Sequence, residues 1–388
     1  MASWFESLID RKRWTNAWDS VTDLYALQIT FNTSDSSIVK QSDNNTDYHP
    51  IFHIKSDEYK NAHEYWNGDI IDSRQSILVN HININTKWKQ HGITIAGGNG
   101  LGHRLNQLSY PEGIYVDNDD HETIYIADYE NDRIIEWKYG AKNGRVVAGG
   151  NRNGYRSNQL SYPRDVIVDK KNDSLIICDY GNRRVVQWSR QNGKSGETII
   201  SDIDCSRVTM GKDGDLYIAD CEKNEVKGWK QGEREGTIVA GGDGQGNHLK
   251  QLDSPGYIFV DENHSVYVSD CENHRVMKWM KGAKEGIVVA GGKGEGNSLT
   301  QLSSPYGVIV DHLGSVYVAD RYNDRIMRWC EGSCEGSIVV GENGKGARPN
   351  QLNHPKGLSF DVQGNLYVVD KWNNRIQKFD IDSNKINN

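Results

Sequence analysis

The sequence lacks a long apolar run. Of its 388 residues 36% are hydrophobic, and the mean hydropathy is −0.72. No apolar stretch approaches the ~18 residues that a membrane-spanning helix requires. The N-terminus, MASWFESLIDRKRW, mixes acidic and basic side chains and has no continuous apolar core of the kind found in signal peptides. We therefore expect no contact with a membrane. The default location is the cytoplasm, and an extracellular location stays open.

Positive charge is also in short supply. Lys and Arg number 45 against 53 Asp and Glu, which gives a formal net charge of −8. Such a balance provides no general attraction to nucleic acid or to anionic lipid. The 12 histidines show no ligand spacing, either before residue 92 (His49, His53, His63 and His81) or in the loops and turns that follow. The sequence therefore predicts no metal site and no cofactor.

What the sequence does contain is an internal repeat of about 50 residues. Six copies lie between Pro111 and Phe379, and in each an apolar run ends on an aspartate. These aspartates are Asp128, Asp179, Asp220, Asp270, Asp320 and Asp370. An aromatic residue follows nine positions after each of them. A fixed period of this length is typical of a solenoid, a propeller or another repeat array.

Each copy contains four short apolar runs bounded by turn residues. In the fifth copy they are GVIVD (307–311), SVYVAD (315–320), RIMRW (325–329) and SIVVG (337–341). Short runs of this kind predict four strands, and the nearly continuous apolar character of the first two predicts burial on both faces. A four-stranded sheet covered on both faces by its neighbours is a propeller blade, so we predict an all-β fold.

The two ends of the repeat region complement each other. Residues 87–98 carry the fourth-strand pattern without the three strands before it, whereas the last copy (355–379) has three strands and no fourth. We predict that Ile93–Ala96 completes the last blade, which closes six antiparallel blades into a ring and removes an exposed edge. The predicted domains are a small N-terminal appendage at 1–92, with a short helix, strands and a polar loop, and the propeller at 93–388.

The pattern P-x-G-[IV]-x-V-D…Y-[IV]-A-D-x-x-N-x-R-[IV]-x-x-W, with [VI]-A-G-G between copies, resembles the NHL repeat over roughly residues 93–388. The resemblance implies a six-bladed β-propeller. It also implies a fold that serves protein-binding and RNA-binding platforms and a few enzymes, among them zinc-dependent peptide-amidating lyases. A fold alone does not choose among these functions.

The order of the strands places the long Gly-rich loops and the D-x-x-N-x-R loops on one face, around the mouth of the central channel. Residues just after the repeat proline should line this mouth, and the D-x-x-N loops should add a rim. The predicted ligand-binding residues are Glu112, Arg164, Asp165, Tyr257, Tyr306 and Lys356 at the mouth, with Tyr129, Tyr180, Arg321, Tyr322, Lys371 and Trp372 from the loops. Aromatic side chains mixed with both signs of charge suit a peptide, a protein or a glycan, although an ordinary rim can show the same mixture. The repeated Asp, Asn and Arg of the loops are better explained as loop bracing than as catalytic groups.

The third copy departs from the repeat. It lacks the Gly-rich loop and the proline, has Lys223 and Glu225 in place of the loop Asn and Arg, and carries Cys205 and Cys221 on either side of a strand pair. In an oxidising environment we predict disulfides between Cys205 and Cys221 and between Cys330 and Cys334. In a reducing cytosol all six cysteines would remain thiols.

These observations favour a non-enzymatic scaffold that binds a protein or peptide partner through the loop-rich face. The six D-x-x-N-x-R loops hold 12 acidic and 9 basic residues, so nucleic acid is a disfavoured partner. Two alternatives stay open: a metal-dependent lyase or hydrolase with an active site at the channel mouth, and an RNA-binding NHL propeller.

Overall fold

The computed structural model describes residues 82–118, 123–191 and 193–383. The helix, strands and polar loop predicted before residue 82 lie outside these residues. Within the described ranges, no helix combines the length and apolar character needed to cross a membrane.

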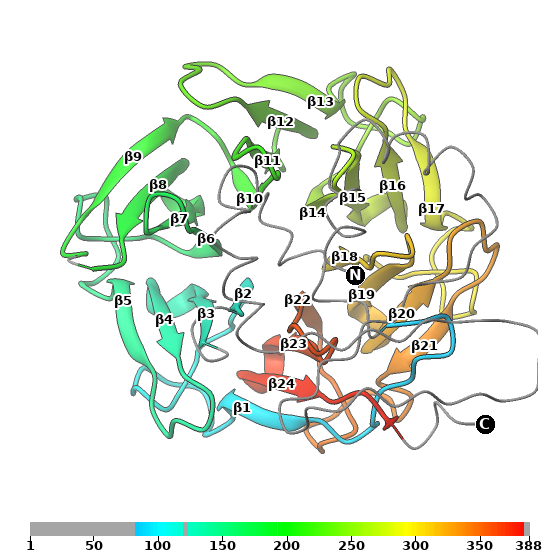
Figure 1. The fold of residues 1–388 in the computed structure, drawn as a ribbon, viewed down its shortest axis with the longest axis horizontal. Coiled ribbons are helices and arrows are strands. Elements are labelled where there is room, and N and C mark those ends of the chain that lie inside the picture. Colours follow the sequence, from blue (N-terminus) through cyan, green and yellow to red (C-terminus); the bar gives the residue numbers. More distant parts are fainter. Residues whose placement is uncertain (1–81, 119–122, 192, 384–388) are drawn as a thin grey trace, which may run out of the picture. The chain divides into compact units, whose positions relative to one another are not determined.

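The described residues form six four-stranded antiparallel sheets arranged around a common axis (Figure 1). The first strand of each sheet lies nearest the axis and the fourth lies outermost. Five of the six second strands, such as β19 (Val316–Asp320), are buried along their whole length, because each sheet is covered by a neighbour on either face. The predicted six-bladed β-propeller is confirmed.

The strands follow one another in chain order within each blade. Blade 1 contains β2 (Ile114–Asp117), β3 (Thr123–Asp128), β4 (Arg133–Trp137) and β5 (Arg145–Gly149). Blade 2 contains β6 (Pro163–Asp169), β7 (Ser174–Asp179), β8 (Arg184–Ser189) and β9 (Gly196–Ser201). Blade 3 contains β10 (Cys205–Met210), β11 (Leu216–Asp220), β12 (Glu225–Trp229) and β13 (Thr237–Gly241). Blade 4 contains β14 (Pro255–Val260), β15 (Val266–Asp270), β16 (Arg275–Trp279) and β17 (Ile287–Gly291). Blade 5 contains β18 (Val308–Val310), β19, β20 (Arg325–Trp329) and β21 (Ser337–Val340).

Blade 6 combines strands from both ends of the repeat region. It contains β22 (Pro355–Phe360), β23 (Leu366–Asp370), β24 (Arg375–Phe379) and β1 (Ile93–Gly97). β1 runs antiparallel to β24, with Ile93 opposite Lys378 and Gly97 opposite Arg375. The strand predicted at 93–96 therefore supplies the outer edge of this blade. Just before it, Trp88 packs against Tyr317 and Phe360.

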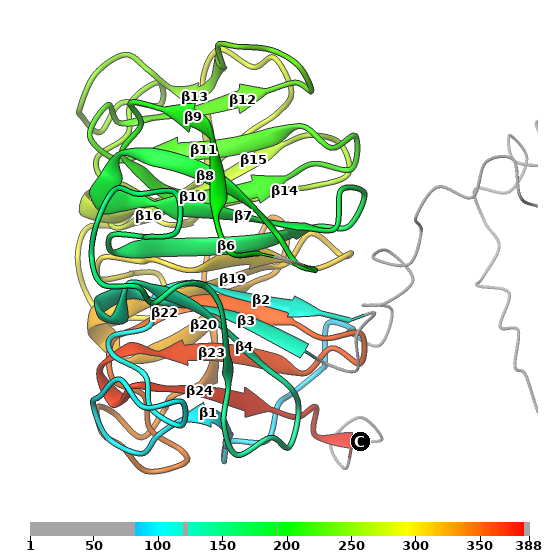
Figure 2. The ribbon, with the colours of Figure 1, turned by 90° about the vertical axis from the view of Figure 1, so that its left-hand side faces the viewer.

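A short 3-10 helix follows the second strand in every blade except the third. These helices are η1 (Tyr129–Asn131), η2 (Tyr180–Asn182), η3 (Cys271–Asn273), η4 (Arg321–Asn323) and η5 (Lys371–Asn373). Second strands end, and first strands begin, at the same face, which is on the left in Figure 2. We call it the loop-rich face.

An aspartate and an arginine brace this face in five blades. In blade 1 the Asp128 carboxylate accepts hydrogen bonds from Ser109 N–H, Asn131 Nδ2 and Arg133 Nε. Arg133 in turn donates to His103 O in the Gly-rich loop, at 2.9 Å. The same Asp–Arg ion pair recurs at 2.7 Å in blades 2, 4, 5 and 6. The bracing role predicted for these residues is confirmed, and the two kinds of loop lie together as expected.

A β-bulge follows the repeat proline in several blades. The pairing register shifts between Pro163 and Asp165, between Pro255 and Ile258, and between Pro355 and Leu358. A bulge inserts an extra residue and changes the direction of a side chain. The innermost strands therefore begin with residues that are not regularly paired, such as Arg164 and Lys356. These residues lie at the loop-rich end of their strands, next to the axis.

Candidate functional site

The functional candidates gather where the first strands begin on the loop-rich face. Blades 1, 2, 5 and 6 each contribute the residue after the repeat proline and the residue after the repeat aspartate. We call this group the axial cluster: Glu112, Arg164, Tyr306 and Lys356, with Tyr129, Tyr180, Arg321 and Lys371. All eight were predicted from the sequence, and contacts described below link them across blades.

Glu112 is the only carboxylate of the axial cluster and holds two ammonium groups. Lys356 Nζ lies 2.7 Å from Glu112 Oε2, and Lys371 Nζ contacts Glu112 Oε1. Burial alone would raise the pKa of the Glu112 carboxyl, but Lys356, Lys371 and Arg164 outweigh burial and hold this pKa at about 2. Glu112 is therefore an anion at neutral pH.

Lys356 is buried between this carboxylate and an aromatic ring. Its Nζ lies 3.7 Å from the ring centroid of Tyr306. Burial lowers the pKa of Lys356 to about 7; Glu112 opposes the shift, whereas Lys371 and Arg321 add to it. The Lys356 ammonium therefore loses its proton at a lower pH than an exposed lysine does.

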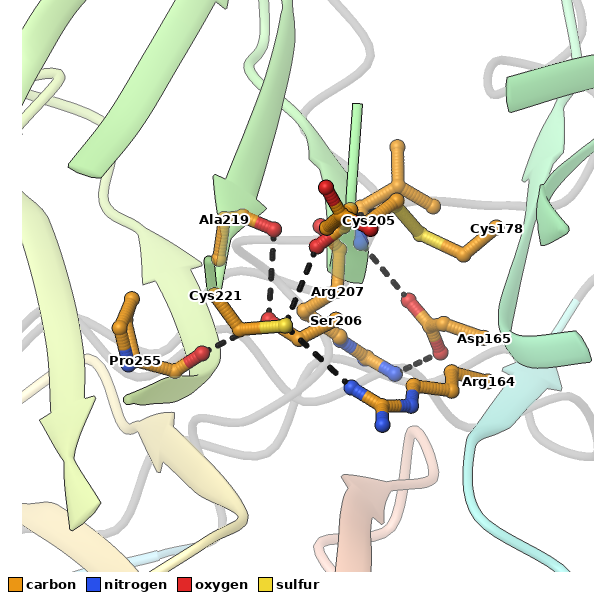
Figure 3. The surroundings of a disulfide bond; sticks show 11 residues. Arg164, Asp165, Cys178, Cys205, Ser206, Arg207, Ala219, Cys221 and Pro255 are labelled. Carbon is orange, nitrogen blue, oxygen red and sulfur yellow. Dashed lines mark hydrogen bonds and ion pairs between the residues drawn. A yellow bond between two sulfur atoms is a disulfide. The ribbon is translucent and has the colours of Figure 1, made fainter. Parts of the chain in front are cut away.

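Arg164 contacts its own blade and the neighbouring blade 3. Its guanidinium carbon lies 3.3 Å from the ring centroid of Tyr180, and its Nη1 donates to Cys221 Sγ at 3.5 Å (Figure 3). Burial would lower the pKa of Arg164, but Tyr306 and Glu112 raise it above its ordinary value.

The axial cluster carries an excess of positive charge. Arg164, Arg321, Lys356 and Lys371 surround the single carboxylate of Glu112. The count of loop charges in the sequence suggested a mildly acidic face. That count covers only the D-x-x-N-x-R loops and leaves out Arg164 and Lys356, which belong to the first strands and supply half of the positive groups at the axis.

A second layer of side chains lies one residue further along the first strands. Arg207 forms an ion pair with Asp165 and places its guanidinium carbon 3.7 Å from the ring centroid of Tyr257. The Tyr257 hydroxyl donates to Leu358 O at 3.1 Å, which links blade 4 to blade 6. Burial raises the pKa of the Asp165 carboxyl, while Arg207 and the Val208 N–H oppose the shift. Asp165 and Tyr257, both predicted at the mouth, are buried, as are Glu112, Tyr306 and Lys356. We call Asp165, Arg207 and Tyr257 the floor of the axial cluster, because each lies one residue further along its first strand.

Aromatic side chains form an arc around the axial cluster. We call them the rim aromatics: Tyr110, Tyr162, Tyr322, His354 and Trp372. Trp372 stacks on His354 with ring centroids 4.3 Å apart, and Tyr322 and Tyr110 meet the two ends of this stack edge-on. Tyr162 lies against Tyr129 at 5.1 Å. Tyr322 and Trp372 remain 52% and 50% exposed, so the arc is available to a partner.

Three of the rim aromatics were not predicted. Tyr110, Tyr162 and His354 each precede a repeat proline and adopt positive φ angles of 47°, 49° and 55°. Only residues after the proline and residues of the D-x-x-N loops were predicted to line the mouth and its rim. The left-handed conformation turns the chain at this point, so the residue before the proline also reaches the rim. An aromatic at this position in three copies was the available signal.

The other side of the ring has a different character. In blades 3 and 4 the axis is lined by Ser206 and Gly256, and the exposed side chains above it include Glu222 and Glu272. Cys271 donates to Pro305 O at 2.9 Å, and burial raises the pKa of its thiol to about 12. The aromatic and cationic groups at the axis therefore come from blades 5, 6, 1 and 2, whereas blades 3 and 4 place small side chains there and expose Glu222, Lys223 and Glu272 above them.

The structure contains one disulfide, between Cys178 in β7 and Cys205 in β10 (Figure 3). The predicted Cys205–Cys221 pair is wrong, because a bulge between Cys205 and Arg207 places Cys205 opposite Asp220 and lets it pair with blade 2. The second predicted pair is also absent, since Cys330 and Cys334 are free thiols. Across the described ranges, no group of three or more His, Cys, Asp or Glu could hold a metal ion.

The comparisons with known proteins agree with this fold. The NHL repeat model matches residues 352–379. A structural genomics protein of unknown function from Bacteroides thetaiotaomicron VPI-5482 has a TM-score of 0.60 and 17% identity, over 76% of this chain and 77% of that chain. Auxiliary nutrient binding proteins have TM-scores of 0.56: one from the same organism (16% identity, 77% and 74% of the chains) and one from Bacteroides ovatus ATCC 8483 (11% identity, 77% and 78%). No curated protein sequence matches this chain.

Identities this low show the fold alone. The matched segment coincides with the last copy of a unit that occurs six times in the sequence and builds six equivalent blades in the structure. The chain therefore contains an NHL repeat at residues 352–379 and folds as a six-bladed β-propeller.

Proposed function

We propose that this propeller is a non-enzymatic scaffold that binds a protein or peptide partner on its loop-rich face. The rim aromatics carry the proposal. An exposed Trp–His stack flanked by two tyrosines offers a rigid, amphipathic surface, and residues of this kind supply much of the binding energy at protein interfaces.

The titratable groups of the axis support binding rather than nucleophilic catalysis. A catalytic thiol or hydroxyl is normally activated by a lowered pKa or by an adjacent base. Here burial raises the pKa values of the Cys221 and Cys271 thiols and of the Tyr306 hydroxyl. Two structural neighbours are named as nutrient binding proteins, but at 16% and 11% identity their names add only that this fold can serve binding.

The proposal is tested by exposing the immobilised protein to a library of short random peptides and identifying those that are retained. We expect Tyr322→Ala combined with Trp372→Ala to reduce retention by at least about tenfold, since each exposed aromatic anchor contributes roughly 1–2 kcal/mol. Tyr139→Ala, which removes an exposed aromatic from a turn on the opposite face, is the matched control and should retain the same peptides. Retention that is equal in all three proteins, or absent in all three, would contradict the proposal.

A further inference from the structure

We propose that the partner presents a carboxylate to the axial cluster, while its flanking residues lie over the rim aromatics. This inference rests on the proposed function and specifies the chemistry that the site recognises. The carboxylate can belong to an Asp or Glu side chain or to a free C-terminus, and the experiment below separates these two sources.

The first argument is that two arginines of the axial cluster form no ion pair within 4.0 Å of a carboxylate in the described part of the chain, although Glu112 acts on Arg164 from further away. Arg164 contacts Tyr180 and Cys221, and Arg321 donates to Ser304 Oγ at 2.5 Å. Arg321 Nε is buried without a hydrogen-bond partner. A guanidinium has a planar fork of donors that matches a carboxylate, and burial strengthens this attraction. Both arginines are thus able to bind an anion that the protein itself does not provide.

The second argument is the charge balance. Glu112 is already shared between Lys356 and Lys371, so it neutralises only part of the local charge. Like charges that are held together in a poorly hydrated site repel one another, which raises the free energy of the folded protein. A bound anion reduces this repulsion. The cluster should therefore favour a negatively charged group over a neutral one.

The third argument concerns the shape of the ligand. The Arg207 and Tyr257 side chains cross the axis directly beneath the cluster, and Tyr257 reaches the Leu358 carbonyl of blade 6 (Figure 3 shows Arg207 with Asp165). A chain cannot pass this floor without displacing buried contacts. The bound group is therefore a short projection, such as an acidic side chain or a chain end, rather than a strand that threads the ring.

The fourth argument separates a single carboxylate from an extended polyanion. Across the axis, blades 3 and 4 expose Glu222 and Glu272, and the whole chain carries a net charge of −8. RNA or a sulfated polysaccharide, which carries charge along its length, would meet repulsion there. A peptide with one carboxylate can bind the axial cluster without lying over Glu222 and Glu272.

A pH signature follows from Lys356. The charged and titratable groups around it are Glu112, Lys371, Arg321 and Tyr306. Its pKa lies at about 7, and a bound carboxylate would raise it, so binding should take up a proton. We expect affinity to fall by up to about tenfold between pH 6 and pH 8 in the wild type and to change much less in Lys356→Met. Because His354 also lies beside the site, His354→Gln is the control and should keep the pH dependence.

The experiment uses the full chain and two short random peptide libraries, one with free C-termini and one with amidated C-termini. On wild-type protein we expect Asp and Glu to be enriched at least about threefold among retained peptides of the amidated library, or free C-termini to be preferred about as strongly. Enrichment in the amidated library identifies a side-chain carboxylate, whereas a preference confined to the free library identifies the chain terminus.

The double variant Arg321→Gln with Lys371→Gln tests the site directly. This double variant and its control, Lys212→Gln, must first show a wild-type melting curve. We expect the double variant to abolish the preference for carboxylates. Lys212→Gln, which removes one exposed charge from a turn on the opposite face, should leave it intact. If Arg321 and Lys371 prove necessary for folding, the pH dependence of wild-type binding and its loss in Lys356→Met decide the question.

The outcomes distinguish the two proposals. If peptides are retained through Tyr322 and Trp372 with no preference for carboxylates, the scaffold stands and this inference is wrong. If no peptide is retained, the proposed function itself fails. Tighter binding of a single-stranded oligouridine than of any acidic peptide would also overturn the inference, in favour of RNA.

Discussion

Glu112 shows how a single residue sets the charge of this site. Its carboxylate is buried, yet the cations around it hold its pKa at about 2, well below the ordinary value of 4.5. The unfolded chain therefore binds the proton first as the pH falls. The stabilisation from these ion pairs is complete above pH 4.5 and is lost as the pH falls through about 2, a contribution of roughly 3 kcal/mol.

We predict that Glu112→Gln destabilises the protein most at neutral pH, because Lys356 and Lys371 lose their anion. The difference in unfolding free energy between wild type and variant should shrink by about 3 kcal/mol between pH 5 and pH 2. Urea unfolding at several pH values measures it. Glu222→Gln removes an exposed carboxylate from the same face and should differ from wild type by less than about 0.5 kcal/mol throughout. A Glu112→Gln difference that does not depend on pH would rule out this account.

At the scale of elements, the brace explains why the same loop recurs. Each Asp–Arg pair joins the end of a second strand to the Gly-rich loop, so one ion pair orders two segments. Blade 3 is the exception. Glu225 replaces the arginine, and Asp220 Oδ2 is buried without a hydrogen bond, with Lys223 Nζ 3.9 Å away as its cation. The same aspartate therefore has two different environments within one molecule.

This contrast gives a matched pair of variants. Asp320→Asn should cost about 3–5 kcal/mol, because it leaves Arg325 buried without a counterion and disturbs the bonds to Ser303 and Asn323. Asp220→Asn should cost less than about 1 kcal/mol, because no arginine depends on it. Chemical denaturation of both variants measures the difference. Equal costs would show that the aspartate acts without its arginine.

The Cys178–Cys205 disulfide joins blades 2 and 3, the pair of blades whose connection lacks the Gly-rich loop. β9 ends at Ser201 and β10 begins at Cys205, so the brace cannot form there, and the disulfide ties blade 2 to blade 3 instead. We predict four thiols that react in denaturant without a reductant, and six with one. Cys178→Ala with Cys205→Ala should lower the unfolding free energy by about 2–4 kcal/mol. Six reactive thiols in the protein as isolated under non-reducing conditions would show that the pair is not bonded.

At the scale of the whole molecule, the ring depends on a strand taken from the other end of the propeller. β1 gives β24 its outer partner, and Ile82 and Trp88 join the core shared by blades 5 and 6. Without these residues β24 would become an exposed edge, and a buried tryptophan would be lost. Both effects lower stability, and the first also promotes association between molecules.

We therefore predict a large difference between a chain that begins at residue 82 and one that begins at residue 98. The shorter chain should melt at least about 10 °C lower and should form dimers or aggregates, since several kcal/mol of core packing are removed. Calorimetry and size-exclusion chromatography measure the two effects. Because both chains lack residues 1–81, the comparison isolates the segment that contains β1. Similar melting temperatures would mean that closure contributes little.

The blades were predictable because their signals are local and repeated. Apolar runs, turn glycines and the fixed position of the repeat aspartate each specify a strand or a turn within a few residues. Because the repeat occurs six times, a strand with an irregular sequence in one copy can be identified by comparison with the same strand in the other copies. The closing strand at 93–97 was predictable for the same reason. A fourth-strand pattern stands before the first copy, and the last copy lacks its fourth strand.

The sequence by itself determined the strands, their number and the face on which the loops lie, since these follow from periodicity and chain direction. Only the tertiary structure decided the partner of Cys205 and the charge at the axis. A single bulged residue changes which neighbour Cys205 faces, and a count of charges along the chain cannot show that Lys356 and Lys371 meet Glu112. Both depend on contacts between blades, which bring together residues far apart in the chain, and such contacts are not encoded in any local pattern.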